Sequence, residues 1–151
     1  LRCLVGSEMC IRDRTGQVVL PEALEWSGVA VIKEAYRIYK ERGYTTRLLS
    51  AANRNVYHWC EILGGDLVQT INYSWHKRLN ACDVEVKDRM ADQVPEVYMN
   101  ELNKIEEFHK SFEENGMKPE EFVTYGGFRD TLTTFIAGYD DLCKLIRGYM
   151  I

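Results

Sequence analysis

The arginine at position 54 is the side chain of this sequence best placed to do chemistry. It follows a short apolar segment, Thr46–Ala51, and lies between Asn53 and Asn55, just before an amphipathic segment. An arginine between the end of a strand and the start of a helix can hold an anion such as a phosphate, because its guanidinium stays charged and offers a fork of donors. The pattern therefore predicts a phosphorylated substrate at Arg54. The alternative is an arginine that pairs with a nearby carboxylate.

The segments that must position Arg54 alternate between helix and strand. Apolar residues recur at helical spacing after Ser27, a good N-cap, and this pattern stops at Gly43, which predicts a helix between them. Strands are predicted at Thr46–Ala51 and Leu67–Ile71, with a helix between them that either asparagine can cap. This order is typical of a parallel α/β barrel, in which functional groups lie where strands end.

The second half of the sequence predicts helices and a polar loop. A short helix is expected at Ser74–Asn80 and a loop at Asp83–Pro95. A charged helix is expected over Glu96–Asn115, with four apolar side chains inside: Leu102, Ile105, Phe108 and Phe112. The final helix, about Phe128–Arg147, carries an apolar stripe that should face the core. If that stripe is exposed instead, it becomes a surface for a partner.

Length and composition restrict the class of protein. The chain has 151 residues, enough for one domain but fewer than the roughly 250 of a complete (β/α)8 barrel. A net charge of −4 gives no basic field for nucleic acid, and no apolar run is long enough to span a membrane. The five cysteines are an odd number without a CxxC pair, which indicates reduced thiols. We expect a soluble, cytoplasmic protein; the oligomeric state is left open.

The first residues have a pattern of a different kind. Residues 4–13 can be back-translated into a string that resembles a transposase-type sequencing adapter, and the segment has neither a clean period nor a helix cap. We therefore expect residues 1–14 to be an adapter-derived artefact and exclude them from the reasoning about the fold. The protein proper is then residues 15–151, expected to be a fragment whose true start is missing.

Three pieces of sequence together resemble the transaldolase family. In that family a helix of the form G-x-x-x-V-x-x-x-Y-x-Y-Y-K-x-x-G-Y precedes a strand ending in G-A-S-F-R-N, and a further helix leads into A-G-C-D. The corresponding segments here are Gly28–Tyr44, Ser50–Asn55 and Leu63–Asp66. The resemblance covers about a third of the chain, and it implies strands seven and eight of a (β/α)8 TIM barrel with the helices that follow. The expected fold class is thus α/β, the C-terminal part of a TIM barrel, helix-rich as a fragment.

The resemblance also implies a function. Transaldolases transfer a dihydroxyacetone unit between sugar phosphates in the pentose phosphate pathway, through a lysine Schiff base and without metal or cofactor. Their lysine lies on strand four and their acid/base carboxylates on earlier strands, so no catalytic residue is expected in this chain. The match at Arg54 implies the phosphate-binding arginine, with Asn55 shaping the corner. Ala52 replaces the family's serine, and Asn53 replaces an aromatic residue and is expected to supply the lost hydrogen bond.

Other interpretations of the same residues are possible. The altered corner is compatible with a non-catalytic relative that binds sugar phosphates, and a helical interaction module is a third hypothesis. The third fails if the two strands are parallel neighbours with Arg54 at their carboxyl ends. Lys33 lies among charged residues and is expected to be solvated rather than a nucleophile. No zinc site is expected, because the spacing of the candidate ligands matches no common pattern: His58, Cys60, His76 and Cys82.

Overall fold

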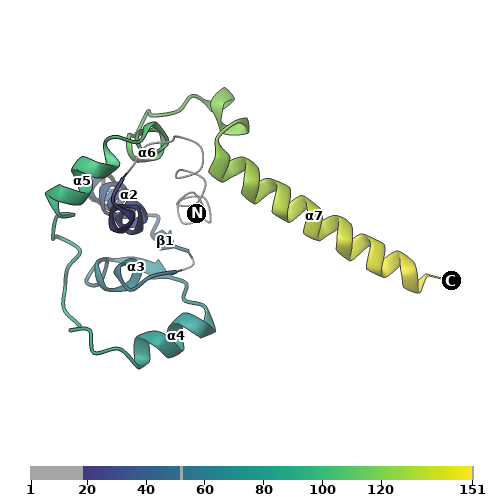
Figure 1. Ribbon diagram of the computed structural model, residues 1–151, viewed down its shortest axis with the longest axis horizontal. Helices are drawn as coiled ribbons and strands as arrows, with labels where there is room; N and C mark the ends of the chain where they lie inside the picture. The colour runs from purple at the N-terminus through teal and green to yellow at the C-terminus, as the bar shows by residue number, and fades with distance from the viewer. Residues whose placement is uncertain (1–18, 52, 151) are drawn as a thin grey trace.

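A computed structural model describes residues 19–51 and 53–150. Its elements in chain order are α2 (Pro21–Glu41), β1 (Leu48–Ser50), α3 (Tyr57–Cys60), β2 (Leu67–Gln69), α4 (Tyr73–Asn80), α5 (Glu96–Leu102), α6 (Glu106–Phe112), the 3-10 helix η1 (Pro119–Val123) and α7 (Gly126–Tyr149). In Figure 1, α2 lies among α3, α5 and α6, while α7 extends away from them. The segment 1–14, predicted to be adapter-derived, lies outside the described residues.

The long helix α2 begins earlier than the sequence predicts. Pro21 occupies its first turn, where a missing N–H costs nothing. The prediction that Ser27 caps the helix is wrong: Ser27 is buried inside the helix, and its hydroxyl donates to the carbonyl of Leu24 at 2.7 Å. The predicted end is confirmed, because the helix stops at Glu41 and Gly43 has a φ of 63°, a conformation that favours glycine.

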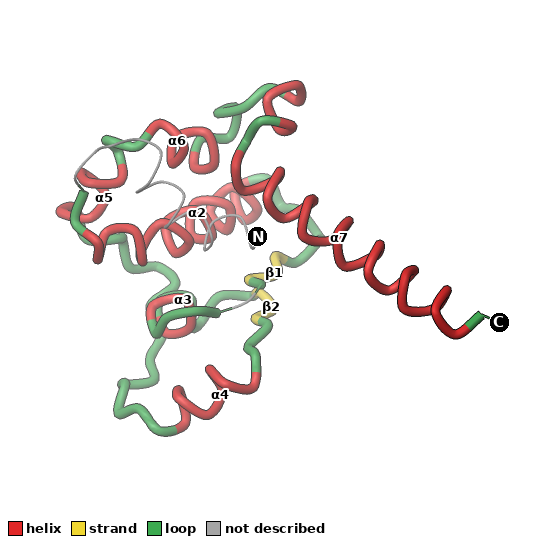
Figure 2. Tube along the Cα trace, turned by 45° about the vertical axis from the view of Figure 1, so that its right-hand side comes forward, coloured by secondary structure: helices red, strands yellow, loops and turns green. Residues whose placement is uncertain are grey.

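The two strands form a parallel pair, as predicted. Leu48 pairs with Leu67, Leu49 with Val68 and Ser50 with Gln69, and Figure 2 shows the strands side by side. Both strands are shorter than predicted, although their centres are correct. Parallel neighbours at this position contradict the hypothesis of a purely helical interaction module. The described residues form a two-stranded sheet within a helix-rich chain, not a closed barrel.

Two groups of buried apolar side chains hold the elements together. The larger group joins α2 to α5 and α6, and its buried members are Ala23, Leu24, Trp26, Val29, Ala30, Leu102, Ile105 and Phe108. The smaller group joins α2 to the segment after α3 and to the loop after α4, through Ile32, Ile62 and Met90. Leu48 and Leu67 of the two strands pack against the smaller group, so the sheet is attached to α2 by one of its faces.

In the second half of the chain one predicted helix is confirmed, and another is replaced by two shorter helices. The predicted helix at Ser74–Asn80 is confirmed as α4, where the Asn72 side chain accepts the N–H of Trp75 at 3.0 Å. The predicted single helix Glu96–Asn115 is wrong, because the chain breaks between α5 and α6 at Ile105, which has extended dihedrals. The break turns the chain so that side chains from both helices, and Ile105 itself, reach α2.

The polar loop after α4 is fixed against the segment that follows α3. Arg89 and Met90 donate their N–H groups to the carbonyl of Leu63 at 3.1 and 3.0 Å. Gly64 has a φ of 85°, and a Cβ there would lie 2.1 Å from the side chain of Asp88. Glycine is therefore required at position 64 both by its backbone conformation and by the close approach of the loop.

The apolar stripe of α7 does not face the core. None of the residues of α7 is buried, and its contact with the described chain is made with η1, where the rings of Phe122 and Phe128 lie 6.4 Å apart. The prediction that this stripe is a core face is therefore wrong for the described chain. Within that part of the chain, no helix is long and apolar enough to cross a membrane.

Phe108 provides a direct test of the larger apolar group. Its ring is 1% exposed and stacks on Phe112, with centroids 5.0 Å apart. Phe108→Ala should lower the free energy of unfolding by roughly 3–5 kcal/mol, because it removes buried contacts and leaves a cavity. Phe122→Ala is the matched control, since Phe122 is 42% exposed, and it should cost less than about 1 kcal/mol. Equal losses in urea unfolding of the two variants would contradict the assignment of Phe108 to the core.

Candidate functional site

The corner that follows β1 lies at the carboxyl ends of both strands. Beyond the last pair of the ladder, the N–H of Thr70 donates to the carbonyl of Ser50 at 2.9 Å, and the N–H of Asn53 donates to the carbonyl of Thr70 at 3.3 Å. These bonds keep the two chains together past the ends of β1 and β2. Arg54 follows directly, before α3 begins. The structure therefore places Arg54 at the edge of the sheet where parallel α/β proteins bind their ligands.

Arg54 is partly exposed, and its guanidinium forms no ion pair with a described residue. Among the ion pairs of the described residues, none involves Arg54. Its backbone N–H donates to Nδ1 of His58 at 3.4 Å. The alternative in which Arg54 pairs with a nearby carboxylate thus has no partner within residues 19–51 and 53–150. A guanidinium in this state can bind an anionic group from outside the chain.

Asn53 is the buried residue of the corner. It is fully buried, and its amide nitrogen donates to Oε1 of Gln69 at 3.1 Å, which links the ends of the two strands. The bond to Gln69 uses one of the two N–H groups of this amide, but the side chain is 0% exposed, so a phosphate reaches the second N–H only if the corner moves. This geometry gives Asn53 a structural role, and its direct contact with a phosphate stays a prediction.

Asn55 and His58 attach the corner to α2. The amide nitrogen of Asn55 donates to the carbonyl of Glu25 at 3.2 Å, and its Oδ1 accepts the N–H of His58 at 2.8 Å. The second bond satisfies an N–H in the first turn of α3, but the N-cap of this helix is Val56, so the prediction that an asparagine occupies the N-cap is wrong. His58 lies directly under Gly28, where a Cβ would approach Nε2 to 3.3 Å. The backbone of Arg54 is therefore held through His58 against a glycine of α2.

His58 is the contributor to this corner that the sequence did not reveal. It is buried, and burial lowers its pKa to about 4; the charge of Arg54 lowers the pKa further, whereas the backbone of Glu25 raises it. A neutral imidazole leaves Nδ1 free to accept the N–H of Arg54 near neutral pH. The approach of Gly28 shows that His58 covers the surface of α2, and its contact with the backbone of Arg54 depends on that placement.

Lys33 is a structural link and not a solvated side chain. The expectation of solvation is wrong: the side chain is 10% exposed, and Nζ donates to the carbonyls of Arg89 and Asp92 at 2.9 and 2.7 Å. Burial lowers the pKa of Lys33 below its ordinary value, and the charges of Glu61 and Asp92 oppose this shift. Nζ also lies 3.6 Å from Glu61, so all of its donors have acceptors. This ammonium fixes the loop after α4 to α2.

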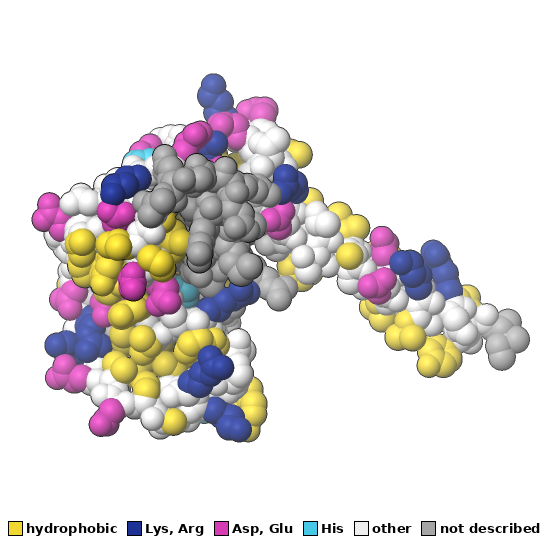
Figure 3. All heavy atoms as spheres, in the orientation of Figure 1, with side chains coloured by type: hydrophobic (Ala, Val, Ile, Leu, Met, Phe, Trp, Pro, Cys, Tyr) yellow, Lys and Arg dark blue, Asp and Glu magenta, His cyan; other side chains and the backbone are white. Residues whose placement is uncertain are grey.

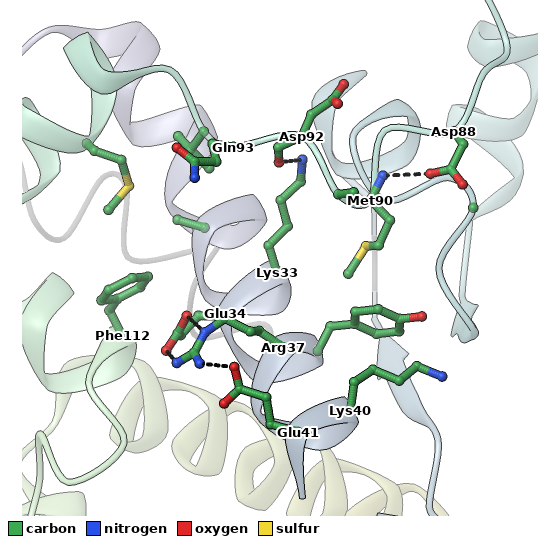
Figure 4. A pocket seen from close by; sticks show the side chains of 16 residues that line it. Lys33, Glu34, Arg37, Lys40, Glu41, Asp88, Met90, Asp92, Gln93 and Phe112 are labelled. Atoms are coloured by element: carbon green, nitrogen blue, oxygen red, sulfur yellow. Dashed lines mark hydrogen bonds and ion pairs between the residues drawn. The ribbon is translucent and has the colours of Figure 1, made fainter. Parts of the chain in front are cut away.

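An open groove of about 720 Å³ runs along α2, away from Arg54. Figure 4 shows Lys33, Glu34, Arg37 and Glu41 along the helix, with Phe112 on one side of them and Met90 on the other. The groove is lined by charges of both signs, and Arg37 pairs with both Glu34 and Glu41. Its lining does not include the corner at Arg54. The groove and the corner are thus separate features of the surface.

The candidate metal ligands do not come together. In the part of the chain that the structure describes, no group of three or more His, Cys, Asp or Glu side chains is placed to hold a metal ion. Of the residues considered from the sequence, Cys60 and His58 are buried in α3, and His76 and Cys82 are exposed. Burial raises the pKa of Cys60, which keeps its thiol protonated and makes it a poor ligand.

Comparison with known families gives one result. The sequence model described as Transaldolase/Fructose-6-phosphate aldolase matches residues 12–146. Neither a curated protein nor a solved structure gave a significant match. The matched region begins before α2 and extends through most of α7, so it includes the parallel strands and the corner at Arg54.

The buried His58 predicts a pH dependence of stability. Its pKa is about 4 in the folded chain, against the ordinary value of 6.5. Between these values the unfolded state takes up a proton that the folded state does not. Stability from this group is complete above pH 6.5 and is lost as the pH falls toward 4. Between pH 7 and pH 5 the loss should be roughly 2 kcal/mol.

The measurement is urea unfolding of the wild type and of His58→Gln at several pH values. The substitution removes the titrating group, so the dependence between pH 7 and pH 5 should flatten. His76→Gln is the control, because His76 is exposed, and it should keep the wild-type slope. Parallel curves for His58→Gln and the wild type would show that His58 does not titrate as a buried neutral group.

Proposed function

We propose that this chain, which belongs to the transaldolase/fructose-6-phosphate aldolase family, serves the transfer of a dihydroxyacetone unit between sugar phosphates through a lysine Schiff base. Membership of the family supports an aldolase- or transaldolase-type enzyme of carbohydrate metabolism that acts on sugar phosphates. The finer assignment to dihydroxyacetone transfer in the pentose phosphate pathway is our proposal. The observation that carries it is Arg54 at the carboxyl end of a parallel strand, with no ion-pair partner in the part of the chain that the structure describes.

In this proposal Arg54 binds the phosphate of the substrate. Its guanidinium offers several donors, is partly exposed, and has no carboxylate partner among the described residues. Asn55 holds the corner to α2 through the carbonyl of Glu25. Asn53 holds the ends of the strands together, and because it is fully buried it contacts the phosphate only if the corner opens. Specificity for phosphorylated sugars then rests on one charge in a corner fixed by two asparagines.

We also propose that residues 15–151 form the C-terminal part of a barrel of the transaldolase type and that the Schiff-base lysine is not among them. None of the lysines of the sequence falls within β1, β2 or the corner at positions 51–56. The most buried candidate, Lys33, already holds two carbonyl oxygens and Glu61. A nucleophilic lysine needs a free amine, and the amine of Lys33 is not free while these contacts last.

A non-catalytic relative that binds sugar phosphates is the second candidate. The observation that favours it is the altered corner, in which Ala52 stands at the family's serine and the amide of Asn53 already has an acceptor. Both candidates require phosphate binding at Arg54, and they differ in turnover. The first candidate needs a lysine on an earlier strand of the complete polypeptide, so the upstream reading frame distinguishes them.

Arg54→Ala tests the phosphate contact. The change should weaken binding of fructose 6-phosphate to the 151-residue chain roughly tenfold to a hundredfold, because a charge-assisted hydrogen bond is lost. Binding of fructose should not change, since this sugar lacks the phosphate. Both affinities can be measured by titration followed by NMR. Arg78→Ala is the control: Arg78 is exposed and stacks on Trp75 at 4.8 Å. Equal losses for the two sugars would show that Arg54 is structural.

The absence of a free catalytic lysine leads to a second prediction. The purified 151-residue chain should show no transaldolase turnover, and treatment with borohydride in the presence of fructose 6-phosphate should leave its mass unchanged. A Schiff base needs an unprotonated amine that can reach the carbonyl. Intact-protein mass spectrometry is the measurement. A borohydride-trapped sugar adduct would contradict the prediction, and peptide mapping would then show whether Lys33 had formed it.

A further inference from the structure

The backbone N–H of Arg54 donates to a histidine side chain, a contact that the proposed function does not explain. The acceptor is Nδ1 of His58, at 3.4 Å. The neighbours of Arg54 are attached elsewhere: the N–H of Asn53 binds the chain beyond β2, and the amide of Asn55 binds α2. Among these contacts of the corner, the one to His58 is made by the backbone of the arginine itself.

The corner receives little help from the charge of the rest of the chain. The net charge is −4, and on the face that Figure 3 presents, Lys and Arg side chains are scattered among acidic and apolar ones. A broad positive field would attract an anion whatever the exact position of one arginine. Where one guanidinium makes the contact, affinity depends on how well its donors are held at the place that the anion occupies.

The imidazole ring of His58 is held on two sides. The backbone N–H of His58 donates to Oδ1 of Asn55 at 2.8 Å, which fixes the start of the side chain. The ring is buried against α2, where a Cβ on Gly28 would lie only 3.3 Å from Nε2. The ring therefore has no room to retreat toward α2, and Nδ1 stays on the side of Arg54.

The hydrogen bond with Arg54 also determines where the ring carries its proton. A neutral imidazole has one N–H, so Nδ1 accepts only when the proton is on Nε2. Nε2 is buried and has no hydrogen-bond partner among the described residues. The carbonyl of Glu25 favours a proton on the ring, but it accepts the amide of Asn55.

This arrangement leaves one buried donor without a partner, which costs free energy. With the proton on Nδ1 instead, two N–H groups would face each other, and the N–H of Arg54 would lose its acceptor. The ring of His58 thus leaves its own N–H unsatisfied on one side and satisfies the backbone of Arg54 on the other.

We propose that His58 is a positioning residue of the anion site, whose Nδ1 holds the backbone of Arg54 where the guanidinium can bind the phosphate of the substrate. This inference rests on the proposed function, in which Arg54 binds that phosphate. Because burial and the charge of Arg54 lower the pKa of His58 to about 4, the ring is neutral at neutral pH and acts through its lone pair. His58 should therefore affect the affinity for a phosphorylated sugar and leave the affinity for fructose unchanged.

The test compares two substitutions that place an amide at different points. In His58→Asn, Oδ1 takes the position of Nδ1 and can still accept the N–H of Arg54. In His58→Gln the amide lies farther along the side chain, so this acceptor is lost although more of the volume of the ring is kept. Titration with fructose 6-phosphate, followed by NMR, should give His58→Asn an affinity within about twofold of the wild type. His58→Gln should bind roughly threefold to tenfold more weakly.

A role in packing alone predicts the opposite order of the two variants. Asparagine leaves the larger cavity, so His58→Asn should be the less stable variant in urea unfolding. If packing alone mattered, it would also be the weaker binder. Equal affinities of the two variants, or weaker binding by His58→Asn, would overturn the proposal. His76→Gln is the control, because His76 is exposed, and it should bind like the wild type.

Hydrogen exchange of the Arg54 amide separates this inference from the proposed function. The amide should exchange faster in His58→Gln than in the wild type and in His58→Asn. If the wild type binds fructose and fructose 6-phosphate equally, the proposed function fails, whereas this pattern of exchange would still show that His58 positions the backbone. Equal exchange in all three proteins would overturn the inference. A wild-type ring with its proton on Nδ1 in ¹⁵N NMR would overturn it without any substitution.

Discussion

The packing of α2 between two groups of apolar side chains is the interaction on which the rest of the described chain depends. One side of the helix contacts α5 and α6, and another contacts Ile62 and Met90. Near its first turns, Trp26 stacks between Tyr57 and Tyr98, with centroids 4.8 and 5.6 Å apart. An isolated helix gains little stability from its own hydrogen bonds, so these contacts account for most of its stability. Each element that carries a functional group is positioned by its contact with α2.

The corner at Arg54, where we propose that a phosphate binds, also depends on its contacts with α2. Arg54 lies outside the apolar groups, but its backbone is held by His58, which is buried against Gly28 of α2. Asn55 makes a second attachment, to the carbonyl of Glu25. The guanidinium is thereby presented by a fixed backbone, while its charge has no ion-pair partner among the described residues. A site that binds an anion needs this combination, because a paired arginine would have to break one ion pair to form another.

The sequence was most informative where local rules and burial agree. The end of α2 at Gly43, the parallel strands and the cap of α4 at Asn72 each follow from a local pattern that the structure retains. The start of α2 was predicted wrongly at Ser27. A serine hydroxyl can cap a helix, but it can equally donate to a backbone carbonyl within one, as Ser27 does to Leu24.

Other features could not be read from local patterns. At Ile105 the chain breaks one long helix into two, and the side chain of Ile105 is buried in the larger apolar group. The helical spacing of the apolar residues does not show where such a break occurs. The roles of Lys33 and His58 depend on segments distant in sequence, the loop at Arg89–Asp92 and Gly28. The position of Arg54 after a parallel strand was predicted from a local signal and is confirmed, whereas its binding of a phosphate stays a prediction.

Two surfaces of the described chain are uncovered, and they differ in kind. Leu48 and Leu67 face the apolar group on α2, whereas Leu49 and Val68 are 45% and 40% exposed on the opposite side of the sheet. Parallel strands are normally covered on both faces, and in a barrel the inner face is filled by side chains of the other strands. Leu49 and Val68 thus lie on the face of the pair that the described chain leaves uncovered. The exposed apolar stripe of α7 instead has the spacing of three and four residues that is typical of a helix covered along one side.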